Sequence, residues 1–282
     1  MVGATDRQQE GPLGARSLPP PIPTGRSAIS ASPLGSPASS WSAPDLTGED
    51  YAVVLNRLHA TFTPQTYLEI GVSTGASLEL ASCFSIAIDP NFMIDRPVLK
   101  NKPACCFYSM TSDKFFLQYN PSTVFGRPIE MAFLDGMHLF ECLLRDFSNV
   151  EKHCKSNSIV LLHDCVPIDE YVCRRDINDH RLKQRSAHPD WWAGDVWKVV
   201  DILLKFRPDL TVVIFDATPT GLVAVTHLDP SSTFLNDQYF SLVEDYKDKK
   251  LTEHGDAYYQ SLKLLATRQY ASFEALSTLF WL

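Results

Sequence analysis

Residues 67–75 read Tyr67-Leu68-Glu69-Ile70-Gly71-Val72-Ser73-Thr74-Gly75, an apolar run that ends in a turn of glycine and hydroxyl side chains. Glycine has no Cβ atom, so a ligand can approach the backbone closely at Gly71 and Gly75. A helix is expected to follow over 76–81, and its first N–H groups would face the same ligand. This pattern predicts a binding site at the carboxyl end of a strand.

Four later apolar runs of strand length repeat the pattern, at 85–89, 105–108, 129–135 and 158–164. The polar residues at their ends are Asp89, Ser109 to Ser112, Asp135 to His138, and His163-Asp164. In an open parallel sheet, ligands bind outside the carboxyl ends of the strands. We therefore expect all five strand ends to contribute to one site.

Helical patterns alternate with these runs at 48–60, 139–153 and 195–206, and Asp195 is expected to cap the last of them. Two final runs, 210–215 and 221–226, flank a Thr-Pro-Thr turn and predict a hairpin. Nearly continuous apolar strands that alternate with helices are typical of a mostly parallel sheet covered on both faces. The predicted class is α/β, with one antiparallel strand near the edge.

Three segments are expected along the chain. Residues 1–45 hold eight of the 19 prolines and many Ser and Gly residues, so they predict a disordered tail. Within the tail, the run 18–23 favours polyproline II and could bind a partner's groove, although an unstructured extension is the simpler interpretation. The α/β domain is expected to cover 46–229, and a helical extension to cover 230–282.

Charge and cysteine content exclude several classes of protein. The 282 residues carry a net charge of −8, and all of it belongs to residues 46–282, where 22 basic side chains face 30 acidic ones. This balance argues against nucleic acid or an anionic membrane as the main partner. The seven cysteines form no C-x-x-C pair, and we see neither a secretory signal nor an apolar run long enough to span a bilayer. We expect a cytoplasmic protein with reduced thiols.

The turn and the next strand end together suggest a type of cofactor. The spacing of Gly71 and Gly75 is G-x-x-x-G and not the G-x-G-x-x-G of dinucleotide-binding proteins. Asp89 closes the following strand, where its carboxylate could accept hydrogen bonds from both hydroxyls of a ribose. These features point to a nucleoside-containing cofactor without an obligatory pyrophosphate.

Residues 67–75 resemble motif I of class I S-adenosylmethionine-dependent methyltransferases, and Ala87-Ile88-Asp89-Pro90 resembles the acidic end of their second strand. Residues 133–138 and 160–164 resemble the D-G-x-H and H-D motifs of the methyltransferase domain 24 group, which is similar to small-molecule O-methyltransferases. The resemblance covers about residues 48–228. It implies a Rossmann-like, seven-stranded sheet of order 3-2-1-4-5-7-6 and methyl transfer from S-adenosylmethionine to a small-molecule acceptor.

The same resemblance implies roles for individual residues. Those of the cofactor site would be Glu69, Gly71, Ser73, Gly75, Asp89, Met110, Thr111 and Asp135, with Asp89 on the ribose and Met110 and Thr111 beside the adenine. Asp135 would lie next to the methyl donor, and His138 would be the general base for an acceptor hydroxyl of a sugar or natural product, since the usual pKa of imidazole is near neutral. Oxygen rather than nitrogen as acceptor is a preference that comes from the family.

A metal site is a further implication of the family. Some relatives bind Mg²⁺ through acidic residues that Asp135 and Asp164 match, whereas His163 stands where another acidic residue is expected. Because Mg²⁺ prefers oxygen ligands, a site that includes His163 would better suit Zn²⁺, Mn²⁺ or Fe²⁺. Capping of the helices that follow is the simpler role for Asp135 and Asp164.

Three other functions fit parts of the sequence. Gly71-Val72-Ser73-Thr74-Gly75 also matches G-x-S-x-G, the nucleophile turn of α/β-hydrolases, but that function leaves Asp89 unexplained. A nicotinamide-dependent oxidoreductase would need a third glycine near this turn, where Ala76 and Ser77 follow. A non-catalytic methyltransferase-like binding module is the third alternative.

Two groups of residues outside these motifs have both a structural and a functional interpretation. Trp191, Trp192 and the loop around them could pack in the core or cover the acceptor as a lid. The C-terminal aromatic residues are expected to bury against the domain or against a second copy of the chain. A basic patch in the same long loop could bind an anionic group or form a solvated surface, and its members are Arg174, Arg175, Arg181, Lys183 and Arg185.

Overall fold

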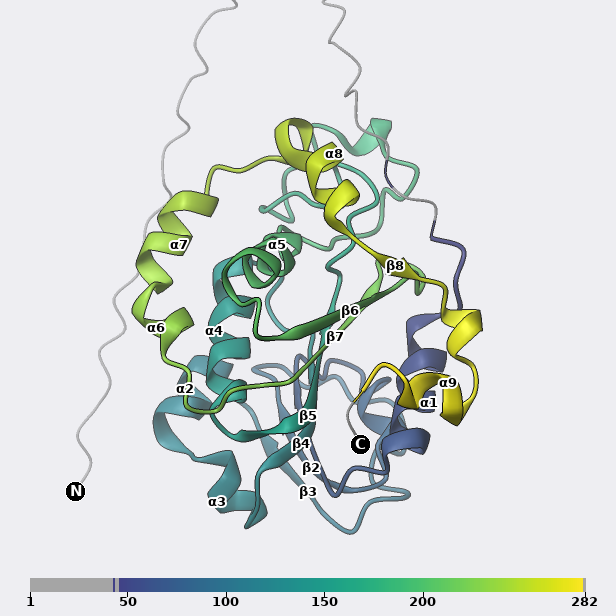
Figure 1. Ribbon diagram of the computed structural model, residues 1–282, viewed down its shortest axis with the longest axis vertical. Coiled ribbons are helices and arrows are strands. Elements are labelled where there is room, and N and C mark those ends of the chain that lie inside the picture. Colours follow the sequence, from purple (N-terminus) through teal and green to yellow (C-terminus); the bar gives the residue numbers. More distant parts are fainter. Residues whose placement is uncertain (1–42, 44–45, 281–282) are drawn as a thin grey trace, which may run out of the picture. The chain divides into compact units, whose positions relative to one another are not determined.

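The computed structural model describes residue 43 and residues 46–280. The expected tail over 1–45 therefore lies outside the described residues, apart from Ala43. The described chain forms an eight-stranded sheet of order β3-β2-β1-β4-β5-β7-β6-β8 (Figure 1). Its strands are β1 (Thr66–Ile70), β2 (Phe84–Ile88), β3 (Cys105–Tyr108), β4 (Ile129–Leu134), β5 (Cys154–His163), β6 (Thr211–Phe215), β7 (Leu222–Thr226) and β8 (Leu264–Leu265).

The expected order 3-2-1-4-5-7-6 is confirmed, and β7 is antiparallel to both β5 and β6 as the hairpin predicted. The expected number of seven strands is wrong. An eighth strand, β8, pairs in parallel with β6 through Ile214 opposite Leu264 and Phe215 opposite Leu265. The segment that was expected to be only helical thus also extends the sheet and covers its edge.

Helices cover both faces of the sheet (Figure 1). On one face lie α4 (Phe140–Glu151) and α5 (Trp197–Phe206), and on the other lie α1 (Tyr51–Phe62) and α9 (Phe273–Ser277). The remaining helices are α2 (Ser112–Gln118), α3 (Pro121–Phe125), α6 (Phe234–Asp237), α7 (Tyr239–Tyr246) and α8 (Leu251–Ser261), with short 3-10 turns η1 (Leu78–Leu80), η2 (Lys183–Arg185) and η3 (Thr267–Tyr270).

Two hydrophobic clusters result, one on each face of the sheet. The first joins α4 and α5 to buried residues of the C-terminal segment, including Leu242 and Tyr258. The second joins α1 to Leu276 and Phe280. Of the C-terminal aromatic residues, Tyr258 and Phe280 thus bury against their own domain, whereas Phe273 is exposed.

Two local expectations are wrong. The helix expected over 76–81 is only the 3-10 turn η1, because β2 begins at Phe84 and leaves too few residues for a helix to cross the sheet. Asp195 does not cap α5, since the residue at the N-cap is Val196 and the end has no side-chain cap. Its carboxylate accepts a hydrogen bond from the backbone N–H of Phe140 instead, at 3.0 Å.

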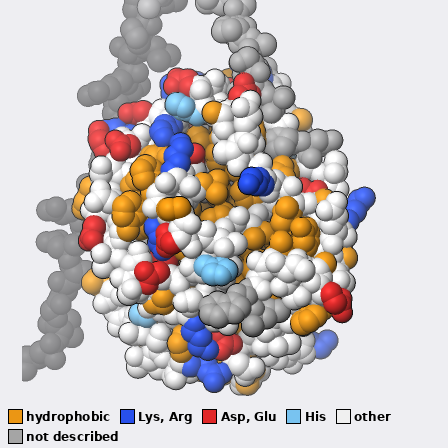
Figure 2. Space-filling model, viewed as in Figure 1, with side chains coloured by type: hydrophobic (Ala, Val, Ile, Leu, Met, Phe, Trp, Pro, Cys, Tyr) orange, Lys and Arg blue, Asp and Glu red, His pale blue; other side chains and the backbone are white. Residues whose placement is uncertain are grey.

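The face that carries α5, α7 and β8 has an apolar middle and a charged surround (Figure 2). Hydrophobic side chains gather toward the middle of this face, and acidic and basic side chains are interspersed around them. A membrane-crossing helix is not found within the described ranges, where every helix is too short or too polar.

Candidate active site

The pairing register of the central strands places the predicted site residues at the same edge of the sheet. Ile70 lies opposite both Ile88 and Leu134, and Leu134 lies opposite Leu162. The next residue in each strand therefore belongs to the same edge: the Gly71 N–H donates to the Ile88 carbonyl at 2.9 Å, and the Asp135 N–H donates to the Ile70 carbonyl at 2.9 Å.

A cavity of about 600 Å³ opens at this edge. Its volume is in the range of pockets that hold cofactors. Most of the residues that were predicted to bind the cofactor line it: Gly71, Ser73, Asp89, Met110, Thr111 and Asp135. Met137, His138, Cys142 and Asp146 complete the wall that the β4–α4 connection provides.

The turn after β1 is built for close approach. Gly71 has a φ of +86°, and a Cβ atom on it would lie 2.0 Å from the carbonyl oxygen of Asp135. Asp89 fixes the turn from the neighbouring strand, because its carboxylate accepts hydrogen bonds from the N–H of Ser73 at 2.8 Å and from the N–H of Asn91 at 2.7 Å. The carboxylate lies on the cavity wall and keeps further lone pairs for a ligand.

Two predicted cofactor residues are not among those that line the cavity, Glu69 and Gly75. The Glu69 carboxyl is fully buried on the face of β1 that also carries Tyr67. The hydroxyls of Tyr67 and Ser77 donate to it at 2.7 and 2.6 Å. Burial raises the pKa of Glu69 to about 8, against the effect of these two hydrogen bonds. The structure thus gives Glu69 partners within the fold.

Two acidic and two imidazole side chains meet at the ends of β4 and β5. His138 Nε2 lies 3.3 Å from Asp135 Oδ1, and His138 Nδ1 lies 3.3 Å from Asp164 Oδ2. His163 Nδ1 lies 3.3 Å from the same Asp135 oxygen and 3.5 Å from Asp164 Oδ1. We call these four side chains the Asp/His cluster.

Charge balance within the Asp/His cluster stabilises the ionised forms. Burial alone would lower the pKa of His138, but the hydrogen bond with Asp135 and the charge of Asp164 raise it to about 9. The pKa of His163 is also about 9, because the charges of Asp135 and Asp164 outweigh its burial. Burial raises the pKa of Asp135, yet the two histidines hold it well below its usual range.

Asp135, His138 and Asp164 each place one ligand atom within 4.8 Å of the others, so the three side chains could hold a metal ion. This group contains His138 in the place where the sequence suggested His163. The Thr220 hydroxyl donates to Asp164 Oδ1, so part of that carboxylate already has a partner. One nitrogen and two carboxylates suit Zn²⁺, Mn²⁺ or Fe²⁺ better than Mg²⁺.

Tyr51 lies beside the Asp/His cluster, a contact that the sequence did not indicate. Its ring lies 4.1 Å from the His163 ring, centroid to centroid, at the first turn of α1. Burial, followed by the charge of Asp135, raises the pKa of Tyr51 to about 12. Tyr51 and His163 are far apart in the sequence. They come into contact because α1 packs over the sheet, so no local sequence pattern predicts the contact.

The loop before α5 packs directly on His138. The Trp192 carbonyl lies 2.8 Å from His138 Nδ1, and the two rings are 4.9 Å apart between centroids. Gly194 has a φ of +61°, and a Cβ atom there would lie 1.7 Å from the carbonyl oxygen of His138. Trp197, by contrast, is buried in the core.

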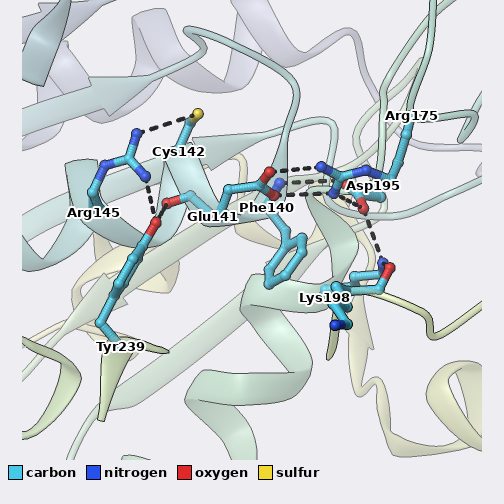
Figure 3. Close-up of polar contacts among 9 residues, drawn as sticks. Phe140, Glu141, Cys142, Arg145, Arg175, Asp195, Lys198 and Tyr239 are labelled. Atoms are coloured by element: carbon cyan, nitrogen blue, oxygen red, sulfur yellow. Dashed lines mark hydrogen bonds and ion pairs between the residues drawn. The ribbon is translucent and has the colours of Figure 1, made fainter. Parts of the chain in front are cut away.

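Asp195 anchors this loop (Figure 3). Besides the Phe140 N–H, its carboxylate accepts from Arg175 at 2.6 Å and from the buried Lys198 at 2.9 Å. Arg175 also makes two hydrogen bonds to Glu141, at 3.0 and 2.6 Å. The loop is therefore fastened to the first turn of α4, next to His138.

The basic patch suggested by the sequence is largely paired within the protein. Arg174 donates to the carbonyls of Tyr171, Ile177 and Trp191, and Arg181 pairs with Asp179. These contacts favour a structural role for the patch over an anion site. The seven cysteines are all free thiols.

No protein-family model matches the chain, and no curated protein matches it either. Solved structures that are similar to it include a putative O-methyltransferase from Klebsiella pneumoniae, with a TM-score of 0.43 and 12% identity over 62% of this chain and 79% of that one. The methyltransferase PaMTH1 from Podospora anserina, bound to S-adenosylhomocysteine, has a TM-score of 0.44 and 14% identity over 64% and 78% of the two chains.

The O-methyltransferase TomG from Streptomyces achromogenes, in complex with S-adenosylmethionine, has a TM-score of 0.41 and 17% identity over 65% and 82% of the two chains. Similarity at this level does not assign an activity. The function of this chain must therefore be argued from its own cavity and from the side chains around it.

Proposed function

We propose that this protein transfers a methyl group from S-adenosylmethionine to a hydroxyl of a small molecule. The observation that carries the proposal is the cavity itself, which has the Gly71 turn and the Asp89 carboxylate on one wall and Asp135 and His138 on another. A ribose fits the first pair, and a reacting centre fits the second. The strand order that surrounds the cavity is the order that the family resemblance implied.

Each end of the cofactor has a natural place in this cavity. The Gly71 turn would receive the amino-acid end, and Asp89 would accept hydrogen bonds from the ribose hydroxyls. The adenine would extend toward Met110 and Thr111. The sulfonium would then lie toward Asp135, whose negative charge favours a cation.

When bound, S-adenosylmethionine would supply the methyl group: the acceptor oxygen would bond to the methyl carbon as the S–CH₃ bond breaks, and the electron pair would stay on sulfur to give S-adenosylhomocysteine. His138 would take the hydroxyl proton. The Trp192 carbonyl accepts from Nδ1–H, which leaves Nε2 as the basic atom. The pKa of His138 is about 9 beside Asp135 and Asp164, and a positive sulfonium next to it would oppose its protonation before transfer.

Asp135, His138 and Asp164 also fit a divalent metal, since their ligand atoms lie within 4.8 Å of one another. A metal bound there would orient the acceptor and lower the pKa of its hydroxyl. The three side chains would in that case hold the ion, and His138 would need to be neutral.

The other functions have weaker support. A hydrolase would need a histidine beside Ser73, and the structure gives the Ser73 hydroxyl no histidine partner among the described residues. A non-catalytic module would not need the Asp/His cluster at the rim of the cavity. A hydrolase also does not explain why Asp89 and Asp135 lie on one cavity.

The test uses S-adenosylmethionine with a tritiated methyl group and a panel of acceptors that carry phenol, sugar hydroxyl or amine groups. We expect label in a methyl ether, and His138→Ala to lower the rate by about 10²–10⁴-fold while the cofactor still binds. Ser73→Ala separates the hydrolase function, because it would abolish ester hydrolysis and only weaken methyl transfer. Transfer to no acceptor, with ester hydrolysis that Ser73→Ala removes, would overturn the proposal.

A further inference from the structure

Asp146 is a carboxyl group inside the cofactor cavity that none of the roles above uses. It belongs to α4, is 3% exposed, and lines the cavity together with Gly136 and Ser112. One of its oxygens, Oδ2, lies 3.7 Å from the place that a Cβ atom on Gly136 would take. The carboxyl group is therefore positioned between the end of β4 and the start of α2.

No cation forms an ion pair with Asp146 among the described residues. The side chain of the adjacent Arg145 instead contacts Cys142 and Tyr239 (Figure 3) and pairs with Asp113 at 2.8 Å. Burial raises the pKa of Asp146 to about 7. The Ser112 hydrogen bond and the charge of Arg145 act against this rise, and the charge of Asp113 adds to it. A buried carboxyl with one hydroxyl partner retains acceptor capacity.

The surroundings of Asp146 select the kind of group that it would bind. Met110 and Thr111 immediately precede Ser112, so Asp146 lies at the end of the cavity where the adenine is proposed. Adenine carries one strong donor on its ring edge, the N6 amino group. A buried acceptor strengthens the binding of a base that carries such a donor. It weakens the binding of a base that lacks the donor, because the acceptor then stays unpaired.

We infer that Asp146 is a specificity-determining residue, which accepts a hydrogen bond from the N6 amino group of the cofactor's adenine. This inference rests on the proposed function and assigns one of its contacts. The alternative is a purely structural role, in which Asp146 only holds Ser112 at the first turn of α2.

Calorimetry with two ligands separates these roles: S-adenosylhomocysteine, and its analogue with hydrogen in place of the N6 amino group. We expect the wild-type protein to prefer S-adenosylhomocysteine by about tenfold or more. Asp146→Leu should remove this preference. Asp146→Asn should keep it, because the amide oxygen still accepts from N6.

An equal preference in the wild type and Asp146→Leu would overturn the inference, as would no preference in the wild type. Thermal unfolding of both variants shows whether they fold. If Asp146→Leu does not fold, a wild type without the preference, or loss of the preference in Asp146→Asn, still overturns the inference. If the wild type binds neither ligand, the proposed function fails, and the assignment of Asp146 fails with it. Binding of both ligands with equal affinity rejects the assignment of Asp146 alone.

Discussion

At the level of single residues, the site depends on where parallel strands end. Asp89, Asp135 and His163 are far apart in the sequence but follow strands whose last residues are in register. The sequence predicts their proximity because a buried parallel sheet has one carboxyl edge. The local pattern of apolar runs was therefore enough to predict that these residues lie at one edge of the sheet.

Residues on helices were harder to predict. Tyr51 and Asp146 reach the site from α1 and α4, and their direction depends on how each helix rotates against the sheet. Asp146 sits in a helical pattern in which a charged residue usually faces solvent. Its burial is a tertiary property, and the sequence offers no local signal for it.

His59 gives a prediction about pH that is independent of the active site. It lies buried in α1 beside Tyr67, and neither ring nitrogen has a hydrogen-bond partner among the described residues. Burial lowers the pKa of His59 to about 4 from a usual value of 6.5. Between pH 6.5 and pH 4, His59 is protonated in the unfolded chain but neutral in the folded protein. His59 therefore makes the folded protein less stable as the pH falls through this range.

Replacement of His59 by leucine should remove that loss. Urea unfolding at pH 7.5 and pH 4.5 should show the variant gaining about 2 kcal/mol on the wild type at the lower pH. His254→Leu is the control, because His254 is largely exposed on α8. A difference between wild type and His59→Leu that is the same at both pH values would contradict the assignment.

At the level of elements, the loop that ends at Asp195 links the site to α4 and α5. The sequence identified Asp195 as a helix cap, since an aspartate before a helical pattern commonly caps that helix. In the structure the Asp195 carboxylate links different elements, because it accepts hydrogen bonds from Phe140, Arg175 and Lys198. Such a network joins positions that are distant in the sequence, so no local pattern shows it.

Asp195→Ala should strongly destabilise the fold. The change leaves Lys198, which is 1% exposed, as an unpaired buried charge, and loss of one partner of a buried pair costs about 3–5 kcal/mol. Chemical denaturation measures this directly. Asp190→Ala is the matched control, because the exposed Asp190 lies 3.8 Å from Lys183 and should change stability by less than about 0.5 kcal/mol.

A cost for Asp195→Ala no larger than that of its control would mean that the network in Figure 3 does not hold the loop.

At the level of the whole molecule, the alternation of apolar runs and helices was sufficient to predict the α/β class and the order of seven strands. The eighth strand was missed because Leu264-Leu265 is too short to show any periodicity. The C-terminal segment is part of both hydrophobic clusters, with Tyr258 in one and Leu276 in the other. We therefore propose that residues 230–280 fold together with the α/β domain and not as an independent unit.

Two substitutions in α9 test this proposal. Leu276 is 1% exposed, so Leu276→Ala should lower the free energy of unfolding by about 2–5 kcal/mol. Phe273, in the same helix, is 53% exposed, and Phe273→Ala should cost less than about 1 kcal/mol. One cooperative unfolding transition is expected in both variants, and a separate early transition in Leu276→Ala would show an independent C-terminal unit.

The central claim is that the cavity at the strand ends holds S-adenosylmethionine with its ribose on Asp89. The most direct measurement is calorimetric titration of the wild type and Asp89→Ala with S-adenosylhomocysteine, with and without a chelator. We expect micromolar binding by the wild type and at least about tenfold weaker binding by the variant, since two hydrogen bonds to a charged group are lost. Absence of binding by the wild type, or equal affinity in a folded Asp89→Ala variant, would contradict the account.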